Sequence, residues 1–199
     1  MTQVVIIDNG GGNVASVRYA LERLGCATLL TNDAARVRAA GGVILPGVGA
    51  AREAMRRLAA AGLDRLIPTL TQPVLGICLG MQLLHAASAE GDTDCLGILP
   101  GRATRLGEAP GRSVPHMGWN QLQPVRPSPL LAGISAGDYA YFVHSYVLPP
   151  GPDTVATCDY GGPFSAVVSR GNFHGAQFHP ERSAQTGARL LANFVALAG

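Results

Sequence analysis

Lysine is absent from this sequence of 199 residues, so arginine supplies all fifteen of its positively charged side chains. Without a lysine amine, the chain can neither form a Schiff base with a carbonyl substrate nor provide the lysine of a phosphate-binding P-loop. Charged residues of either sign make up only 14% of the chain, and the formal net charge is +2. Proteins that bind nucleic acids usually present a concentrated basic face, so this composition argues against that function.

Cysteine is scarce as well, because the four thiols are scattered and no two of them form a C-x-x-C pair. This spacing argues against a zinc site or a redox pair, and we expect neither a metal nor an organic cofactor. No apolar run approaches the roughly 20 residues that span a bilayer. The first residues also lack the basic segment and apolar run of a secretory signal. We therefore expect a reduced, cytoplasmic protein.

Short apolar runs alternate with amphipathic segments in the first half of the chain. Alternation of this kind is typical of a parallel sheet with helices on both faces. In such sheets, binding sites form beyond the carboxyl ends of the strands. We predict strands at residues 4–7, 27–30, 43–45 and 74–77, and helices at residues 14–24, 34–40, 50–61 and 79–87.

The second half has strands and turns but little helix between residues 96 and 178. Aromatic and β-branched residues predict strands at 139–148, 155–158, 165–168 and 172–178. Ser183 is the predicted N-cap of a final helix, whose apolar face is expected to be Ala188, Leu191, Phe194 and Val195. We expect one α/β domain over residues 1–199, with an open, mostly parallel sheet flanked by helices and an added antiparallel section.

One cysteine lies in a distinctive setting, the sequence Gly-Ile-Cys-Leu-Gly-Met-Gln at residues 76–82. A predicted strand leads directly into a predicted helix through Cys78, which has a glycine two residues away on each side. This is the pattern of a nucleophile elbow, a tight turn that leaves little room for neighbouring β-carbons. The helix N-terminus that follows favours a thiolate. The alternative, a buried structural cysteine, is what we expect for Cys26, Cys95 and Cys158.

A second motif, Gln-Phe-His-Pro-Glu at residues 177–181, follows the last predicted strand. A histidine at a strand end, here His179, can lie over the same sheet edge as Cys78. Glu181 can then hydrogen-bond the far ring nitrogen of His179 and fix the tautomer of the ring. The three residues would then form a catalytic triad. A His-x-Glu pair alone is commonly an ordinary surface pair, whereas its combination with the elbow is far more specific.

Such a nucleophile needs backbone N–H groups that stabilise a developing oxyanion. Leu79, directly after the cysteine, can offer one of them. The sequence Pro-Gly-Val-Gly-Ala at residues 46–50 can offer another near Val48 and Gly49. Because a glycine lies on each side of Val48, one peptide of this segment has the freedom to rotate. The same segment fits an ordinary strand-to-helix turn equally well.

The motifs at 76–82 and 177–181 together resemble those of class I (triad) glutamine amidotransferases, over almost the whole chain. Further segments resemble the branch of that family that supplies ammonia for imidazole glycerol phosphate synthesis in histidine biosynthesis. They are Ile-Asp-x-Gly-x-Gly-Asn at 7–13, Val-Pro-His-Met-Gly-Trp-Asn at 114–120 and Tyr-Phe-Val-His-Ser-Tyr at 141–146.

The resemblance implies a glutaminase that forms a thioester with its substrate. In it, Cys78 is the nucleophile, His179 the general base and acid, and Glu181 the group that orients the histidine. The residues implied in binding the glutamine head group are Gln82, Gly49, His144 and Ser145.

The resemblance also implies a partner, a (β/α)8-barrel cyclase that receives the ammonia within a heterodimer. Asn13 and Trp119 are expected on the side that contacts this cyclase. Members of the family are expected to be nearly inactive alone, so we predict that the cyclase and its nucleotide ligand shift the segment at 46–50 toward the active arrangement.

Three alternatives remain open. A glutaminase that serves anthranilate, GMP or pyridoxal phosphate synthesis would keep the chemistry and differ only in its partner. An inactive binding module would keep the fold, although the intact triad argues against it. A cysteine peptidase on a related α/β fold is disfavoured mildly by Gln82 and by the absence of a processing segment.

Overall fold

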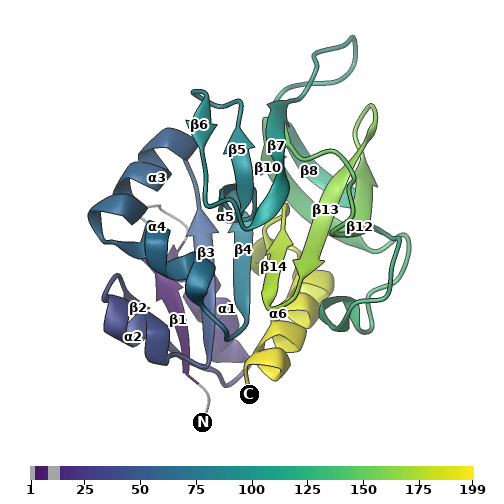
Figure 1. Ribbon diagram of the computed structural model, residues 1–199. Helices are drawn as coiled ribbons and strands as arrows, with labels where there is room; N and C mark the ends of the chain where they lie inside the picture. The colour runs from purple at the N-terminus through teal and green to yellow at the C-terminus, as the bar shows by residue number, and fades with distance from the viewer. Residues whose placement is uncertain (1–2, 9–13) are drawn as a thin grey trace.

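The computed structural model describes residues 3–8 and 14–199 (Figure 1). Within these residues the main sheet has eight strands in the order β2-β1-β3-β4-β14-β13-β12-β9. The first five run parallel to one another and the last three pair antiparallel, which confirms the predicted sheet with an antiparallel section. Their bounds are β1 Gln3–Ile7, β2 Ala27–Thr31, β3 Gly42–Gly47, β4 Val74–Cys78, β14 Phe173–Ala176, β13 Pro163–Arg170, β12 Thr154–Asp159 and β9 Gln123–Pro124.

Helices cover both faces of this sheet (Figure 1). None of the helices in the described part of the chain is long and apolar enough to cross a membrane. The helices are α1 Val14–Arg23, α2 Ala34–Ala39, α3 Ala51–Ala60, α4 Leu63–Leu66, α5 Leu79–Leu83 and α6 Ala184–Ala198, and the 3-10 turns are η1 Ile67–Thr69, η2 Pro129–Leu131 and η3 Pro180–Arg182.

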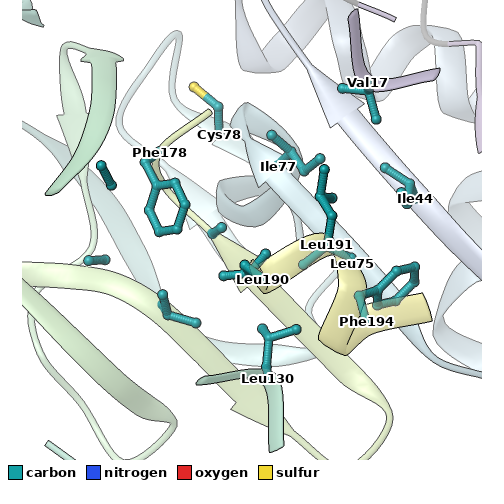
Figure 2. Close-up of a cluster of buried hydrophobic side chains, with 14 of the residues drawn as sticks. Val17, Ile44, Leu75, Ile77, Cys78, Leu130, Phe178, Leu190, Leu191 and Phe194 are labelled. Carbon is teal, nitrogen blue, oxygen red and sulfur yellow. The ribbon is translucent and has the colours of Figure 1, made fainter. Parts of the chain in front are cut away.

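Two apolar layers form because successive side chains of a strand point to opposite faces of the sheet. In β1, Val4 and Ile6 pack in one cluster with α1 and α6, whereas Val5 and Ile7 pack in the other with α2, α3 and α4. Figure 2 shows the first cluster, in which Phe194 of α6 lies among the buried side chains. Burial on both faces explains why β1 is a continuous apolar run rather than an alternating one.

Two smaller sheets lie beside the main one. The four-stranded sheet has the order β11-β7-β5-β6, and its strands β5, β6 and β7 stand above the ends of β3 and β4 in Figure 1. The other pairs β10 with β8, and the strand predicted at 139–148 is split between the two sheets at Ser145. The bounds are β5 His85–Ser88, β6 Thr93–Asp94, β7 Leu99–Arg105, β8 His116–Gln121, β10 Tyr139–His144 and β11 Tyr146–Val147.

The helix predicted at 79–87 is wrong in its second half, because α5 ends at Leu83 and β5 follows. The His85 ring nitrogen Nδ1 hydrogen-bonds the Met81 carbonyl at 3.0 Å. A continued helix would have used that carbonyl for its own backbone. β5 instead pairs with β6 and β7, so tertiary strand pairing overrides the local helical pattern.

The final helix begins after Ser183 as predicted, but this serine makes no side-chain cap. Its hydroxyl instead donates to the His179 carbonyl at 2.7 Å. The predicted apolar face is also wrong in part, because Ala188 is exposed and Leu190 is buried. A β-carbon on Gly187 would lie 1.9 Å from the Pro180 carbonyl oxygen, so α6 packs closely against η3 at this glycine. The buried face of the helix is therefore rotated relative to the predicted one.

Candidate active site

The turn between β4 and α5 has the conformation of a nucleophile elbow. Cys78, the last residue of β4, has φ 53° and ψ −111°, which a residue with a side chain rarely adopts. A β-carbon on Gly80 would lie 1.8 Å from the Leu45 carbonyl oxygen, and one on Gly76 would lie 2.6 Å from the Gly80 oxygen. Both glycines therefore allow backbones to meet more closely than any other residue permits, as the sequence predicted.

The elbow places the cysteine at the edge of the apolar core. Cys78 is buried at one end of the cluster in Figure 2, and its sulfur points away from the other labelled side chains. The sulfur lies 3.7 Å from the Val143 carbonyl oxygen and 3.7 Å from the side-chain nitrogen of Gln177. It is therefore held among polar groups at the carboxyl edge of the sheet.

The structure brings His179 to this sulfur. Strand β14, which precedes the histidine, is the parallel neighbour of β4, which carries the cysteine. Cys78 and His179 line the same pocket and interact there, and the ring nitrogen Nδ1 lies 2.9 Å from Glu181 Oε1. The backbone N–H of His179 also donates to the Tyr141 carbonyl at 2.9 Å. The structure therefore brings Cys78, His179 and Glu181 together at one edge of the sheet.

The charge state of the histidine follows from these contacts. Burial lowers the pKa of His179, but the interactions with Cys78 and with the Glu181 carboxylate raise it to about 10. These interactions therefore favour the protonated ring. An imidazolium in this position can stabilise a negatively charged sulfur and can later donate a proton to a leaving group.

A pocket of about 330 Å³ opens over the triad. It is large enough for an amino-acid substrate and is bounded by the ends of β3, β4 and β10. Its walls include every residue that we predicted for the oxyanion hole and for substrate binding. These residues are Val48, Gly49, Leu79, Gln82, His144 and Ser145.

Gln82 is buried beside the nucleophile and is fixed by two hydrogen bonds. Its side-chain nitrogen donates to the Tyr146 carbonyl at 3.0 Å and to the Gln177 side-chain oxygen at 2.9 Å. Gln177 in turn contacts the sulfur of Cys78, so these side chains form one buried network. The position of Gln177 within the second motif was the only sequence signal for its role.

Glu90 is a pocket residue that the sequence did not indicate. One of its carboxylate oxygens accepts a hydrogen bond from the Ala51 backbone nitrogen at 2.8 Å. It thereby caps α3, whose N-cap residue Ala50 has no side-chain hydrogen bond. A carboxylate at the mouth of a pocket is also suited to bind an ammonium group.

Of the two residues predicted at a partner interface, the structure describes only Trp119, which does not line the pocket. Asn13 is outside the described residues. Trp119 on β8 is 52% exposed and contacts Tyr141 edge to face, with ring centroids 5.8 Å apart. Within the described residues, no group of three or more His, Cys, Asp or Glu side chains is placed to hold a metal ion.

The fold agrees with comparisons to known proteins. Two relatives named imidazole glycerol phosphate synthase subunit HisH, from Xanthomonas axonopodis pv. citri and Xylella fastidiosa, are 59% and 58% identical over 195 residues. Each match covers 98% of this chain and 98% of the relative. A crystal structure of a glutamine amidotransferase superposes with a TM-score of 0.76 at 21% identity, over 98% of both chains. The model of the family described as Glutamine amidotransferase class-I matches residues 5–198. The chain belongs to the class I glutamine amidotransferase family.

Proposed function

We propose that this chain is the glutaminase subunit of imidazole glycerol phosphate synthase. It hydrolyses glutamine to glutamate and ammonia and passes the ammonia to a cyclase, which makes imidazole glycerol phosphate and AICAR in histidine biosynthesis. The observation that carries the proposal is the interaction of Cys78 with His179 in a pocket of about 330 Å³. The His179 ring is also hydrogen-bonded to Glu181. Relatives with 58–59% identity over nearly their whole length support the pathway.

The first half of the reaction releases ammonia. The Cys78 thiolate attacks the side-chain amide carbon of glutamine, and the carbonyl π electrons move onto oxygen. The N–H groups of Leu79 and of the segment around Val48 and Gly49 stabilise that oxyanion. His179 then donates its proton to the amide nitrogen, the C–N bond breaks, and ammonia leaves behind a glutamyl thioester.

The second half of the reaction frees the enzyme. His179, now neutral, removes a proton from water, and the hydroxide attacks the thioester carbon. The C–S bond breaks, and glutamate leaves while the thiolate is restored beside the protonated histidine. Glu181 holds the ring in one tautomer during both halves and stabilises its positive charge.

Substrate recognition follows from the pocket walls. Gln82, Gly49 and the backbone of His144 and Ser145 hold the amino-acid end of glutamine. The Glu90 carboxylate lies on the same pocket and is suited to the α-ammonium group of that substrate.

The partner in this proposal is a (β/α)8-barrel cyclase that forms a heterodimer with the chain in the cytoplasm. Trp119 and Asn13 are the two residues that we assign to this contact from the sequence. Exposed Met117 and Trp119 on β8 support this placement, because large exposed apolar side chains are frequent at interfaces. The match of the family model over residues 5–198 supports a single glutaminase domain across the chain.

The experiment that tests this function is glutamate release from glutamine by the purified chain, alone and with the purified cyclase and its nucleotide ligand. We expect negligible turnover by the lone chain and a rise of at least about a hundredfold in the liganded complex, because a missing oxyanion donor costs about that much. Copurification with the cyclase discriminates this subunit from other amidotransferase glutaminases. Absence of turnover in the liganded complex would refute the proposal.

A further inference from the structure

Strands β8 and β10 form a two-stranded ribbon with two contrasting faces. His116 lies directly opposite His144 in the antiparallel register, and both side chains are buried. The neighbouring positions face the other way, and Met117, Trp119 and Tyr139 are more than half exposed there. The ribbon therefore has an apolar outer face and a buried pair of histidines within.

The two histidines belong to a chain of directional hydrogen bonds. His144 Nδ1 lies 3.0 Å from the Tyr146 carbonyl oxygen, which can only accept, so this nitrogen carries the proton. His144 Nε2 is then the acceptor at 3.1 Å from His116 Nδ1, which must donate. Asn120 completes the chain by donating to His116 Nε2 at 3.4 Å. Neutral rings protonated on Nδ1 are the one arrangement that satisfies every contact.

The surroundings favour neutral rings in fixed positions. Burial lowers the pKa of His116 to about 4, and burial together with the nearby His116 and His179 rings lowers the pKa of His144 to about 3. The His116 ring is stacked between Tyr160, at a centroid distance of 3.9 Å, and Phe142, at 5.0 Å. These rings hold His116 flat and prevent it from turning away from His144.

The chain of hydrogen bonds ends in the wall of the substrate pocket. The Tyr146 carbonyl that accepts from His144 also accepts from Gln82 at 3.0 Å. Because both nitrogens of His144 are used within the protein, this ring has no N–H left for a substrate, and His144 can bind one only through its backbone. The other edge of β10 contacts the catalytic residues, since the Val143 carbonyl lies near Cys78 and the Tyr141 carbonyl accepts from His179.

We propose that His116 is a positioning residue, which acts through its hydrogen bond to His144 and holds the wall formed by residues 144–146 in the shape that binds glutamine. The inference rests on the proposed glutaminase activity. His116 itself does not line the pocket and contacts neither Cys78 nor His179. Loss of its N–H donor leaves His144 Nε2 buried without a partner, which favours rotation of the ring and displacement of the Tyr146 carbonyl.

Two substitutions separate the hydrogen bond from the packing. In His116→Phe, a flat ring of similar size keeps the stack with Tyr160 and Phe142, but the donor to His144 is lost. In His116→Asn, the side-chain amide nitrogen takes the place of Nδ1 and keeps the donor, but most of the stacked ring is lost. Glutamine KM and kcat are measured in the liganded complex with the cyclase, and the thermal midpoint of each variant is measured beside them.

We expect the two variants to rank in opposite orders, so that the variant with the smaller loss of thermal stability has the larger rise in the KM for glutamine. His116→Phe should raise the KM for glutamine about tenfold or more with a small loss of thermal stability. His116→Asn should lose more stability yet keep its KM within about threefold of the unsubstituted chain. A KM that follows the order of the thermal midpoints, or an unchanged KM in His116→Phe, would overturn the positioning role.

A spectroscopic measurement tests the same chain of hydrogen bonds without catalysis. In the ¹⁵N-labelled protein, both His116 and His144 should be neutral and protonated on Nδ1, and His116→Phe should abolish the single tautomer of His144. Protonation of either ring on Nε2 alone would contradict the assignment. Should the unsubstituted complex hydrolyse no glutamine, the proposed function fails, whereas an active complex with an unaffected His116→Phe variant ends only this inference.

Discussion

Cys78 and His179 interact within one pocket at the carboxyl edge of two adjacent parallel strands. The cysteine ends β4 and the histidine follows β14, and the register places Ala176 opposite Ile77, so the two side chains emerge together. Glu181 then contacts the other side of the imidazole at 2.9 Å. The sheet therefore assembles one chemical unit from two motifs that are far apart in the sequence.

Glu181→Gln tests the orienting carboxylate. The substitution preserves the shape but removes the negative charge that helps to raise the pKa of His179. It also permits a ring orientation that no longer serves the sulfur. We expect kcat for glutamine hydrolysis to fall at least about a hundredfold with little change in KM. A variant that retains more than half of the kcat would show that the carboxylate does not support catalysis.

The raised pKa of His179 predicts how stability changes with pH. The folded state holds the proton up to about pH 10, whereas the unfolded chain releases it near 6.5. The stabilisation is therefore complete below about pH 6.5 and is lost as the pH rises toward about 10. Denaturant unfolding should show a difference between the unsubstituted chain and His179→Gln that shrinks over that range.

A second buried histidine is the control for this pH dependence. Burial lowers the pKa of His174, so its contribution is present above about pH 6.5 and is lost as the pH falls. The difference between the unsubstituted chain and His174→Gln should therefore stay level between about pH 6.5 and 10. If the difference in the free energy of unfolding for His179→Gln also stays constant between about pH 6.5 and 10, the pKa of His179 is not raised in the folded state.

Gly80→Ala tests the packing of the elbow. The added methyl carbon would lie 1.8 Å from the Leu45 carbonyl oxygen, and backbone cannot move aside as a flexible side chain can. We expect a loss of at least about 3 kcal/mol in the free energy of unfolding, or failure to fold. Gly151→Ala is the matched control, because no atom lies within 4 Å of its new carbon, and it should change stability by less than about 1 kcal/mol.

Trp119→Ala tests the partner face. Tryptophan is frequent among the side chains that dominate interface energies, so we expect the Kd for the cyclase to rise about tenfold or more. Labelling of Cys78 by a glutamine-mimicking electrophile should stay unchanged in the isolated chain. Val125→Ala, which alters a side chain of the same 52% exposure on another part of the surface, is the control and should bind normally. If Trp119→Ala and Val125→Ala bind the cyclase with equal affinity, the cyclase does not contact the face that carries Trp119.

The sequence predicted the triad because its signals are local. Cys78 has its glycines two residues away on each side, and His179 and Glu181 belong to one short motif. The prediction that they meet required only that both strands end at the same edge of a parallel sheet.

Other features depend on contacts that local patterns do not encode. Glu90 reaches the pocket only because the chain leaves α5 early and forms β5, where a longer helix was predicted. The pairing of His116 with His144 requires the register of β8 against β10, and a shift of one strand by one residue would place the two side chains on opposite faces. The buried face of α6 is likewise set by the close approach of Gly187 to Pro180, which no helical periodicity reveals.

The most direct test of the central claim compares Cys78→Ala with Cys158→Ala in the liganded complex with the cyclase. Cys158 is a buried thiol away from the pocket, so its variant controls for the loss of a cysteine. We predict that Cys78→Ala releases no measurable glutamate from glutamine but still supports synthesis of imidazole glycerol phosphate from added ammonia, whereas Cys158→Ala retains both activities. Glutamine turnover by Cys78→Ala would contradict the assignment of this sulfur as the nucleophile.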